Sequence, residues 1–227
     1  QMFNAIDSVP LTAIAFFMLT GELMTSATIT DRLVALSRAL IGRIRGGLAQ
    51  VNVLVSMFFA GMNGSVVADT ATVGALVLPA MKKAGYPAAF SAAVTGVSST
   101  IGGIIPPSIM MIVLANSTEI SIAALFAAGI IPGVLIGVVI MIINHFFAIK
   151  YNFERSDEPF SILRAGKELY RSSFALLIPL VLVGSVMGGV ASVVEAGAIT
   201  AMVALFTGVF VYRTIKWKDC TGAFRRA

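Results

Sequence analysis

The sequence has little charge and few chemically reactive side chains. Charged residues make up 12% of its 227 residues, whereas a soluble domain carries about 25%. It has one cysteine, Cys220, and one histidine, His145. One cysteine excludes an intrachain disulfide, and one of each cannot form a zinc site of the usual kind. The P-loop pattern that binds nucleotide phosphates is also absent. We therefore expect no enzyme activity and no cofactor.

What the sequence does have is long apolar runs. Hydrophobic residues make up 58% of the chain, and the mean hydropathy is +0.94. The runs cover residues 9–24, 90–114, 122–149 and 174–212, and about 20 apolar residues suffice for a helix to span a bilayer. Runs so poor in charge favour helices over a transmembrane β-barrel, whose strands alternate in polarity. The sequence predicts an all-α integral membrane protein.

The basic residues are clustered, which predicts a topology. All sixteen Lys and Arg residues lie in four stretches: 28–50, 82–87, 150–171 and 213–227. Segments near residues 115–121 and 188–196 contain none. Because cytoplasmic loops are enriched in Lys and Arg, we expect the four basic stretches on the cytoplasmic side. The net charge of +5 therefore indicates membrane orientation, and we expect no nucleic acid as a partner.

Spacing and length divide the chain into segments. Leu33, Leu36, Leu40 and Ile44 recur at helical spacing among arginines, as in an interfacial amphipathic helix. The apolar arms 48–60 and 70–81 are too short to cross a bilayer. We expect a first transmembrane helix over 1–28, an interfacial helix over 29–47, a re-entrant helical hairpin over 48–83, a broken transmembrane helix over 84–116, a transmembrane helix over 117–152, a cytoplasmic linker with an interfacial helix over 153–171, and two transmembrane helices over 172–227. The start lacks the basic region of a signal peptide, and we expect both ends to be cut from a longer protein.

Two polar, helix-breaking segments interrupt the apolar runs. One is Gly61-Met-Asn-Gly-Ser-Val-Val-Ala-Asp69, and the other is Ser98-Ser-Thr-Ile-Gly-Gly-Ile-Ile-Pro-Pro-Ser108. At membrane depth, irregular backbone is tolerated only where it is buried in protein or lines a cavity. Two such breaks in one chain are typical of a transporter site for an ion or a small solute. We therefore expect both segments to be unwound.

The oxygen atoms of these segments suit a hard cation such as Na⁺. Our candidate ligands are Asn63, Gly64, Ser65, Asp69, Ser98, Ser99, Thr100, Gly102 and Gly103. The alternatives are a capped turn without a ligand, with Asp69 as a cap, and hydroxyl groups bonded back to their own helix. Ser108 precedes a half-helix whose N-terminal amides favour an anion, so it is the candidate contact for a substrate carboxylate. Glu22, Glu195 and His145 are interpreted as residues near the membrane interfaces.

Several of these motifs resemble one family. Arg45 to Gly61, Gly64-Ser-Val-Val-Ala-Asp69, Leu78-Pro-Ala-Met-Lys-Lys-Ala-Gly85, the segment from Ser98 to Ile109, Gly21-Glu-Leu-Met24 and Ala128-Gly-Ile-Ile-Pro-Gly133 are similar to the N-terminal half of the large membrane subunit of TRAP (tripartite ATP-independent periplasmic) transporters. The resemblance covers nearly the whole chain. Asn63 stands where the family often has Ser.

The resemblance implies a function that the residues alone do not. The family imports organic acids, such as C4-dicarboxylates or sialic acid, with a Na⁺ gradient across the bacterial inner membrane. A periplasmic substrate-binding protein delivers the organic anion, and a small membrane subunit supports the large one. Transport follows an elevator scheme in a fold of two inverted repeats. This chain contains the first hairpin and broken helix, and we expect the second pair beyond residue 227.

Three other functions compete with this one. The first is an ion-coupled dicarboxylate or citrate carrier that works without a binding protein. The second is an ion channel, because oxygen-lined breaks also form selectivity filters. The third is an intramembrane aspartyl protease. Such an enzyme needs two aspartates within the membrane, whereas Asp69 is the only aspartate in the two interrupted segments and their apolar arms.

Overall fold

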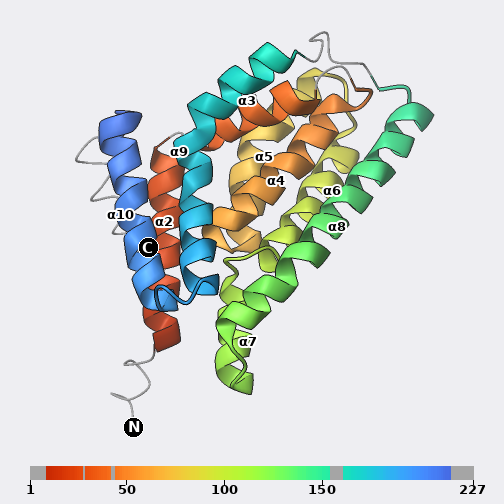
Figure 1. The fold of residues 1–227 in the computed structure, drawn as a ribbon. Coiled ribbons are helices and arrows are strands. Elements are labelled where there is room, and N and C mark those ends of the chain that lie inside the picture. The colour runs from red at the N-terminus through yellow and green to blue at the C-terminus, as the bar shows by residue number, and fades with distance from the viewer. Residues whose placement is uncertain (1–8, 28, 42–43, 154–160, 216–227) are drawn as a thin grey trace.

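A computed structural model describes residues 9–27, 29–41, 44–153 and 161–215, and within them the chain is helical without a sheet (Figure 1). The elements are α2 (Val9–Ser26), α3 (Ile29–Ile41), α4 (Gly47–Asn63), α5 (Val66–Lys83), α6 (Ala88–Ser99), the 3₁₀ turn η1 (Thr100–Gly103), α7 (Ile109–Thr118), α8 (Ile122–Lys150), α9 (Ile162–Met187), α10 (Val193–Phe206) and the π-helical turn η2 (Thr207–Val211). The prediction of an all-α fold is confirmed. Cys220 lies outside the described residues.

Three described helices have the length and composition of membrane spans. They are α8, α9 and the continuous segment Val193–Val211 formed by α10 and η2. The bent pair α2 and α3, which meet at 71°, gives a fourth candidate. Large apolar side chains on these helices face outward, including Ile131 at 76% exposure and Leu180 at 67%. An outward apolar surface of this extent is what a lipid-facing helix presents.

Helix α4 lies at the centre of the packing. It contacts α3, α5, α6, α8 and η1, and its side chains Val53, Val55 and Phe59 are buried. A helix that is hydrophobic on every side is stable only when neighbours surround it. The first arm of the predicted hairpin therefore forms the interior of the molecule.

Two residues separate α4 from α5. Gly64 ends α4 in the left-handed conformation, with φ 60° and ψ 15°, and its N–H donates to the carbonyl of Ala60. Ser65 is extended and caps α5, because its hydroxyl accepts a hydrogen bond from the amide of Ala68 at 3.4 Å. The expectation that residues 61–69 are unwound is thus wrong for most of them. A glycine followed by a serine cap reverses the chain in two residues, so the rest remains helical.

The second interruption is longer. Helix α6 ends at Ser99, tightens into η1 and gives way to irregular backbone, and α7 begins at Ile109. Pro106 and Pro107 supply no backbone N–H, so no helix forms across them. Ser108 caps α7, accepting a hydrogen bond from the amide of Met111 at 3.3 Å. The break was correctly predicted for residues 101–108, but Ser98 and Ser99 are helical rather than unwound.

Helix α9 continues across the expected boundary between an interfacial helix and a span. We expected the first of these to end at Arg171, yet α9 runs unbroken from Ile162 to Met187. Ser172 and Ser173 do not stop it, because their hydroxyl groups donate to backbone carbonyls at Arg32 and Tyr170. The rest of the predicted linker, residues 154–160, lies outside the described residues.

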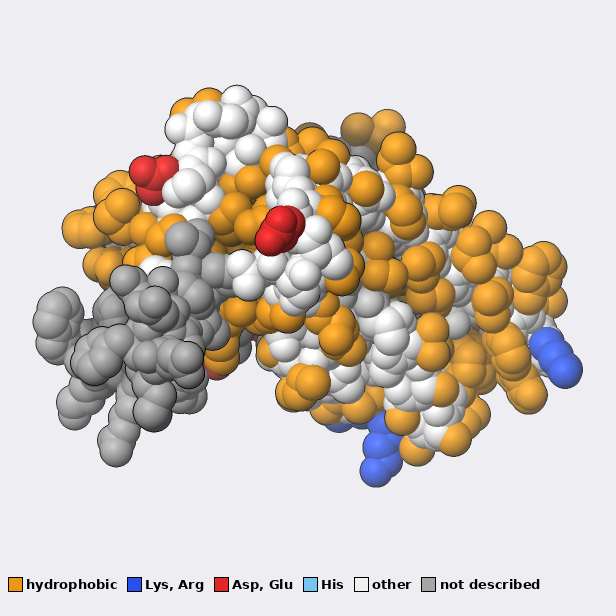
Figure 2. All heavy atoms as spheres, turned by 90° about the horizontal axis from the view of Figure 1, so that it is seen from below, with side chains coloured by type: hydrophobic (Ala, Val, Ile, Leu, Met, Phe, Trp, Pro, Cys, Tyr) orange, Lys and Arg blue, Asp and Glu red, His pale blue; other side chains and the backbone are white. Residues whose placement is uncertain are grey.

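The connections between helices gather at two opposite ends of the molecule. Figure 1 shows the segments near 44–47 and 84–87, the end of α8 near 150–153 and the start of α9 near 161–162 at one end, and those near 115–121 and 188–192 toward the other. Figure 2 views this second end, where apolar side chains predominate, acidic ones appear, and basic ones lie at the margin of the uncovered part. The charge pattern therefore matches the spatial separation, and the cytoplasmic orientation of the first end stays a prediction.

Candidate functional site

The two interruptions lie against each other. The carbonyl oxygen of Gly64 accepts a hydrogen bond from the amide of Ile109 at 3.3 Å. A Cβ atom at Gly64 would lie 2.3 Å from the carbonyl oxygen of Pro107, and one at Gly102 would lie 3.7 Å from the backbone of Ser65. The tip of the α4–α5 hairpin is therefore packed directly on the unwound segment, as the hypothesis of one shared site requires.

A chain of buried polar side chains joins α4 to α6. The side-chain nitrogen Nδ2 of Asn52 donates to Thr95 Oγ1 at 2.7 Å, and Asn52 Oδ1 accepts from Ser98 Oγ at 3.4 Å. Ser98 Oγ also lies 3.2 Å from Ser56 Oγ. All four side chains are buried. Because polar groups in an apolar interior are costly unless they are paired, this network holds α4 and α6 in one relative position.

The carboxylate of Asp69 lies next to this network. The residue has 0% exposure, and its carboxylate lies beside the hydroxyl groups of Ser56 and Ser99. Neither carboxylate oxygen nor Ser99 Oγ has a partner with hydrogen-bond geometry among the described residues. A buried carboxylate without a counter-charge is strongly disfavoured. These three oxygens are the best candidates in the described chain for holding a cation.

The structure shows which residue caps α5, a role that we considered for Asp69. Ser65 is the N-cap of the helix, and Asp69 lies in its first turn. Ser65 therefore carries out the capping that we considered for Asp69. The carboxylate still benefits from the positive end of the helix dipole.

The predicted ligands fall into two groups. Gly64, Ser65, Gly102 and Gly103 surround the contact between the tip and the unwound segment. Asp69, Ser98 and Ser99 are completely buried: Asp69 of α5 lies beside Ser99 of α6, and Ser98 of α6 faces α4. The side chain of Asn63 lies outside the described residues. For all of these residues a role in cation binding stays a prediction.

Two hydroxyl groups are engaged in bonds to the backbone. Thr100 Oγ1 is exposed and donates to the carbonyl of Val97 at 2.7 Å, which is the self-bonding alternative that we considered. The hydroxyl of Ser108 donates to the carbonyl of Gly103 at 2.8 Å as well as capping α7. Ser108 is completely buried, and its contact with a substrate stays a prediction.

Sequence reasoning missed three members of the buried network: Asn52, Ser56 and Thr95. Their spacing was a usable signal. Asn52 and Ser56 are four residues apart within an apolar arm, as are Ser91 and Thr95 in the next segment. Residues four apart lie on the same face of a helix. Two polar stripes in neighbouring apolar helices indicate that the stripes face each other.

The acidic residues interpreted as interfacial have different surroundings. Glu22 lines a cavity of about 130 Å³ beside the tip, together with Thr25, Ser65 and Thr72. Glu195 forms a capping box with Ser192, accepting a hydrogen bond from the Ser192 amide at 2.7 Å. His145 is exposed on α8. Of these three, Glu22 alone lies next to the candidate cation site.

Comparison with known proteins identifies the family. Residues 1–227 match the family described as the tripartite ATP-independent periplasmic transporter, DctM component. The chain belongs to this family. The DctM family consists of transporters, which confirms the expectation that the chain is not an enzyme.

Two relatives illustrate the similarity. The chain is 36% identical over 215 residues to the sialic acid TRAP transporter large permease protein of Vibrio cholerae, covering 95% of this chain and 50% of the relative. It is also 36% identical over 221 residues to the C4-dicarboxylate TRAP transporter large permease protein of Pseudomonas aeruginosa, covering 97% and 51%. The chain thus spans about half the length of these relatives.

Proposed function

We propose that this chain is the N-terminal half of the large membrane subunit of a Na⁺-coupled importer of organic acids. Its family membership supports the transporter class. The names of its relatives support the substrate class, because sialic acid, C4-dicarboxylates and 2,3-diketo-L-gulonate are all organic acids. Such anions gain from movement with a cation, since the cation offsets their charge in a low-dielectric site.

One observation supports the coupling to Na⁺: the two carboxylate oxygens of Asp69 and the hydroxyl oxygen of Ser99 lie together, buried, and none has a partner with hydrogen-bond geometry among the described residues. We assign these oxygens to the coupling ion. Backbone carbonyls of the segment from Ser99 to Gly103, together with Gly64 and Ser65, complete the ligand set. Half-helix ends and unwound carbonyls supply Na⁺ ligands in transporters of this general design.

Family membership supports a proposal for the wider assembly. The α4–α5 hairpin is re-entrant, and α6–α7 is the broken helix of the first of two inverted repeats in an elevator-type fold. The second repeat lies in the part of the protein that this chain does not include. A periplasmic substrate-binding protein delivers the anion, a small membrane subunit supports the large one, and the assembly lies in the bacterial inner membrane.

The decisive test replaces Asp69 by Asn in the full-length protein. A contact with a charged group contributes about 1.5–3 kcal/mol, so we expect the Na⁺ concentration for half-maximal uptake to rise about tenfold or more. Reconstituted uptake measured against Na⁺ concentration checks this. Thr118→Ala is the control, because the exposed Thr118 hydroxyl donates only to the carbonyl of Leu114. Unchanged Na⁺ dependence in Asp69→Asn would contradict the assignment.

The same preparation separates the competing functions. Uptake that requires the soluble binding protein supports the TRAP mechanism, whereas equal uptake without it indicates a carrier of the dicarboxylate or citrate type. Currents far above carrier turnover would indicate a channel.

A further inference from the structure

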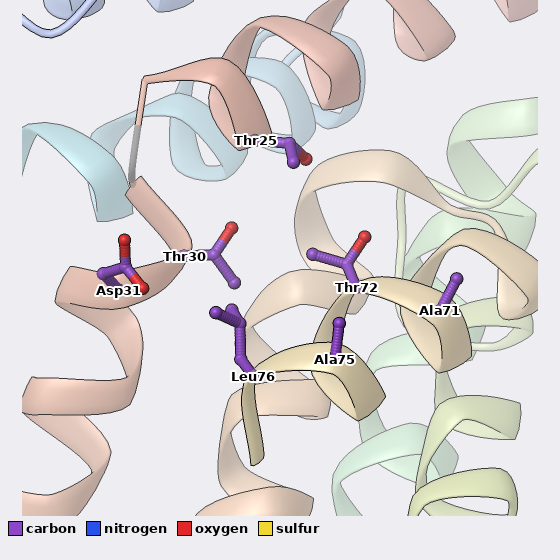
Figure 3. Close-up of a pocket in the computed structure, with 7 residues that line it drawn as sticks. All are labelled: Thr25, Thr30, Asp31, Ala71, Thr72, Ala75 and Leu76. Atoms are coloured by element: carbon purple, nitrogen blue, oxygen red, sulfur yellow. The ribbon is translucent and has the colours of Figure 1, made fainter. Parts of the chain in front are cut away.

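A groove runs between the corner of α2 and α3 and the outer face of α5. Its larger part is a cavity of about 380 Å³ lined by Thr25, Thr30, Asp31, Ala71, Thr72, Ala75 and Leu76. The cavity of about 130 Å³ beside the hairpin tip shares Thr25 and Thr72 with it. The two cavities therefore adjoin, and together they extend from Asp31 to Ser65. Figure 3 shows the side chains of Thr25, Thr30 and Thr72 arranged around the opening.

The lining of the groove favours a hydrated cation over an anion. Glu22 and Asp31 lie toward opposite ends, and no described residue that lines either cavity is Lys or Arg. The space holds several water molecules, since each occupies about 30 Å³. Small side chains on α5, those of Ala68, Ala71 and Ala75, form much of one wall. A cleft lined with carboxylates and hydroxyl groups, and without a cationic side chain, concentrates cations within it.

The two arginines near Asp31 have other partners. Arg32 stacks on the ring of Tyr212, with its guanidinium carbon 3.9 Å from the ring centre. Arg171 is paired with Glu168 at 3.2 Å. Both line a separate cavity that Asp31 also borders, and neither lines the groove. Asp31 borders both cavities, whereas the two arginines border only the separate one.

Thr30 provides an independent indication that the groove holds a polar occupant. Its side chain is 3% exposed, and its Oγ1 has no hydrogen-bond partner within the described structure. Figure 3 shows this oxygen directed into the opening, toward Thr25. A buried hydroxyl without a partner costs about 1–3 kcal/mol, and such groups in native proteins are normally satisfied by water or an ion. To satisfy it, a polar occupant of the groove must come within hydrogen-bond distance of this oxygen.

We propose that this groove conducts hydrated Na⁺ between the basic end of the molecule and the hairpin tip. Asp31 attracts the ion at the opening, Thr30 replaces part of its hydration shell, and Glu22 holds it next to Ser65. This inference rests on the proposed function, because it takes Ser65 to lie at the site of the coupling ion. It adds a pathway and three residues to that site.

Charge-selective labelling tests the groove. In full-length protein with Cys220 and any further cysteine replaced by serine, Thr72→Cys is treated with two membrane-impermeant methanethiosulfonates, one cationic (ethyltrimethylammonium) and one anionic (ethylsulfonate). Each rate is divided by the rate for a small thiol in solution, which removes the intrinsic difference between the reagents. We expect the cationic reagent to be favoured about tenfold, and Na⁺ to slow it. Adding Glu22→Gln and Asp31→Asn should bring the ratio close to one.

Two outcomes would overturn the proposal: no labelling of Thr72→Cys in folded protein, or labelling without preference for the cation. Ala75→Cys reports on the same cavity if Thr72→Cys does not fold. The labelling is read independently of transport, so it separates two failures. A cation-selective groove with unchanged Na⁺ dependence in Asp69→Asn would leave the groove in place and refute the proposed function. Labelling without cation preference, together with a raised Na⁺ requirement in Asp69→Asn, would refute the groove and leave the proposed function in place.

Discussion

The broken helix α6–α7 and its neighbour α8 both contain glycine and proline, yet only one of them is interrupted. Helix α8 runs through Pro132 for 29 residues. The segment with Pro106 and Pro107 leaves the helix after Ser99 and does not resume until Ile109. A single proline removes one backbone hydrogen bond, which a long apolar helix tolerates. Pro106 and Pro107, which follow Gly102 and Gly103, together remove two backbone N–H donors, and the helix ends before them.

The difference also depends on where the freed backbone groups find partners. The amide of Ile109 donates to the carbonyl of Gly64 in the hairpin tip, so the unwound segment is satisfied by another element. Pro132 instead lies on the exposed side of α8. Irregular backbone thus occurs here where a second interrupted element faces it, as expected for irregular backbone at membrane depth.

The glycines of α8 provide the space for this arrangement. Gly129, Gly133 and Gly137 lie four residues apart on one face. A Cβ atom at these positions would lie 2.4 Å from Ile104 O, Ile105 Cγ1 and Met57 Sδ, respectively. The continuous helix is therefore the surface on which the unwound segment and the hairpin rest. Its other faces are apolar and exposed.

The largest effect on this arrangement is expected for Gly64→Ala. The substitution forces a side chain into a left-handed conformation and within 2.3 Å of the Pro107 carbonyl oxygen. Left-handed backbone alone costs about 1–2 kcal/mol, and the clash separates the tip from the unwound segment. We expect Na⁺-dependent uptake to be lost and the melting temperature in detergent to fall.

Gly85→Ala is the matched control for that change. Gly85 also has a positive φ, +79°, but a Cβ atom added there would meet no other atom within 4 Å. It therefore carries the backbone strain without the clash. Equal losses in the two variants would show that the contact between the tip and Pro107 is unimportant.

A smaller effect is expected for Gly129→Ala in α8. Its Cβ would approach the backbone oxygen of Ile104 to 2.4 Å, and overpacking of this kind costs about 1–3 kcal/mol. Gly184→Ala in α9 is the comparison, because nothing lies within 4 Å there; it should be neutral or stabilising by up to about 1 kcal/mol. Thermal unfolding of both variants in detergent checks this. A stable Gly129→Ala protein would mean that the unwound segment is not held against α8.

The contrast shows how far sequence reasoning reached. The prolines and glycines of 101–108 located the second break, because their effect on a helix is local. The extent of the first break was wrong, since Ser65 caps α5 and restores the helix at once. The network through Asn52 and the cavity beside Glu22 depend on which helix faces which. Local pattern does not determine that, although the polar stripes at four-residue spacing, which our sequence reasoning missed, would have indicated one of the faces.

The smallest effect is expected for Pro132→Ala. The substitution supplies an amide that can donate to the carbonyl of Ala128, four residues earlier, and removes a ring from an exposed position. Since α8 is already continuous through this residue, we expect unchanged Na⁺ dependence of uptake and a melting temperature that is equal or slightly higher. If uptake fell while the protein stayed folded, α8 would have to bend during transport. The division between a rigid supporting helix and an interrupted segment would then not hold.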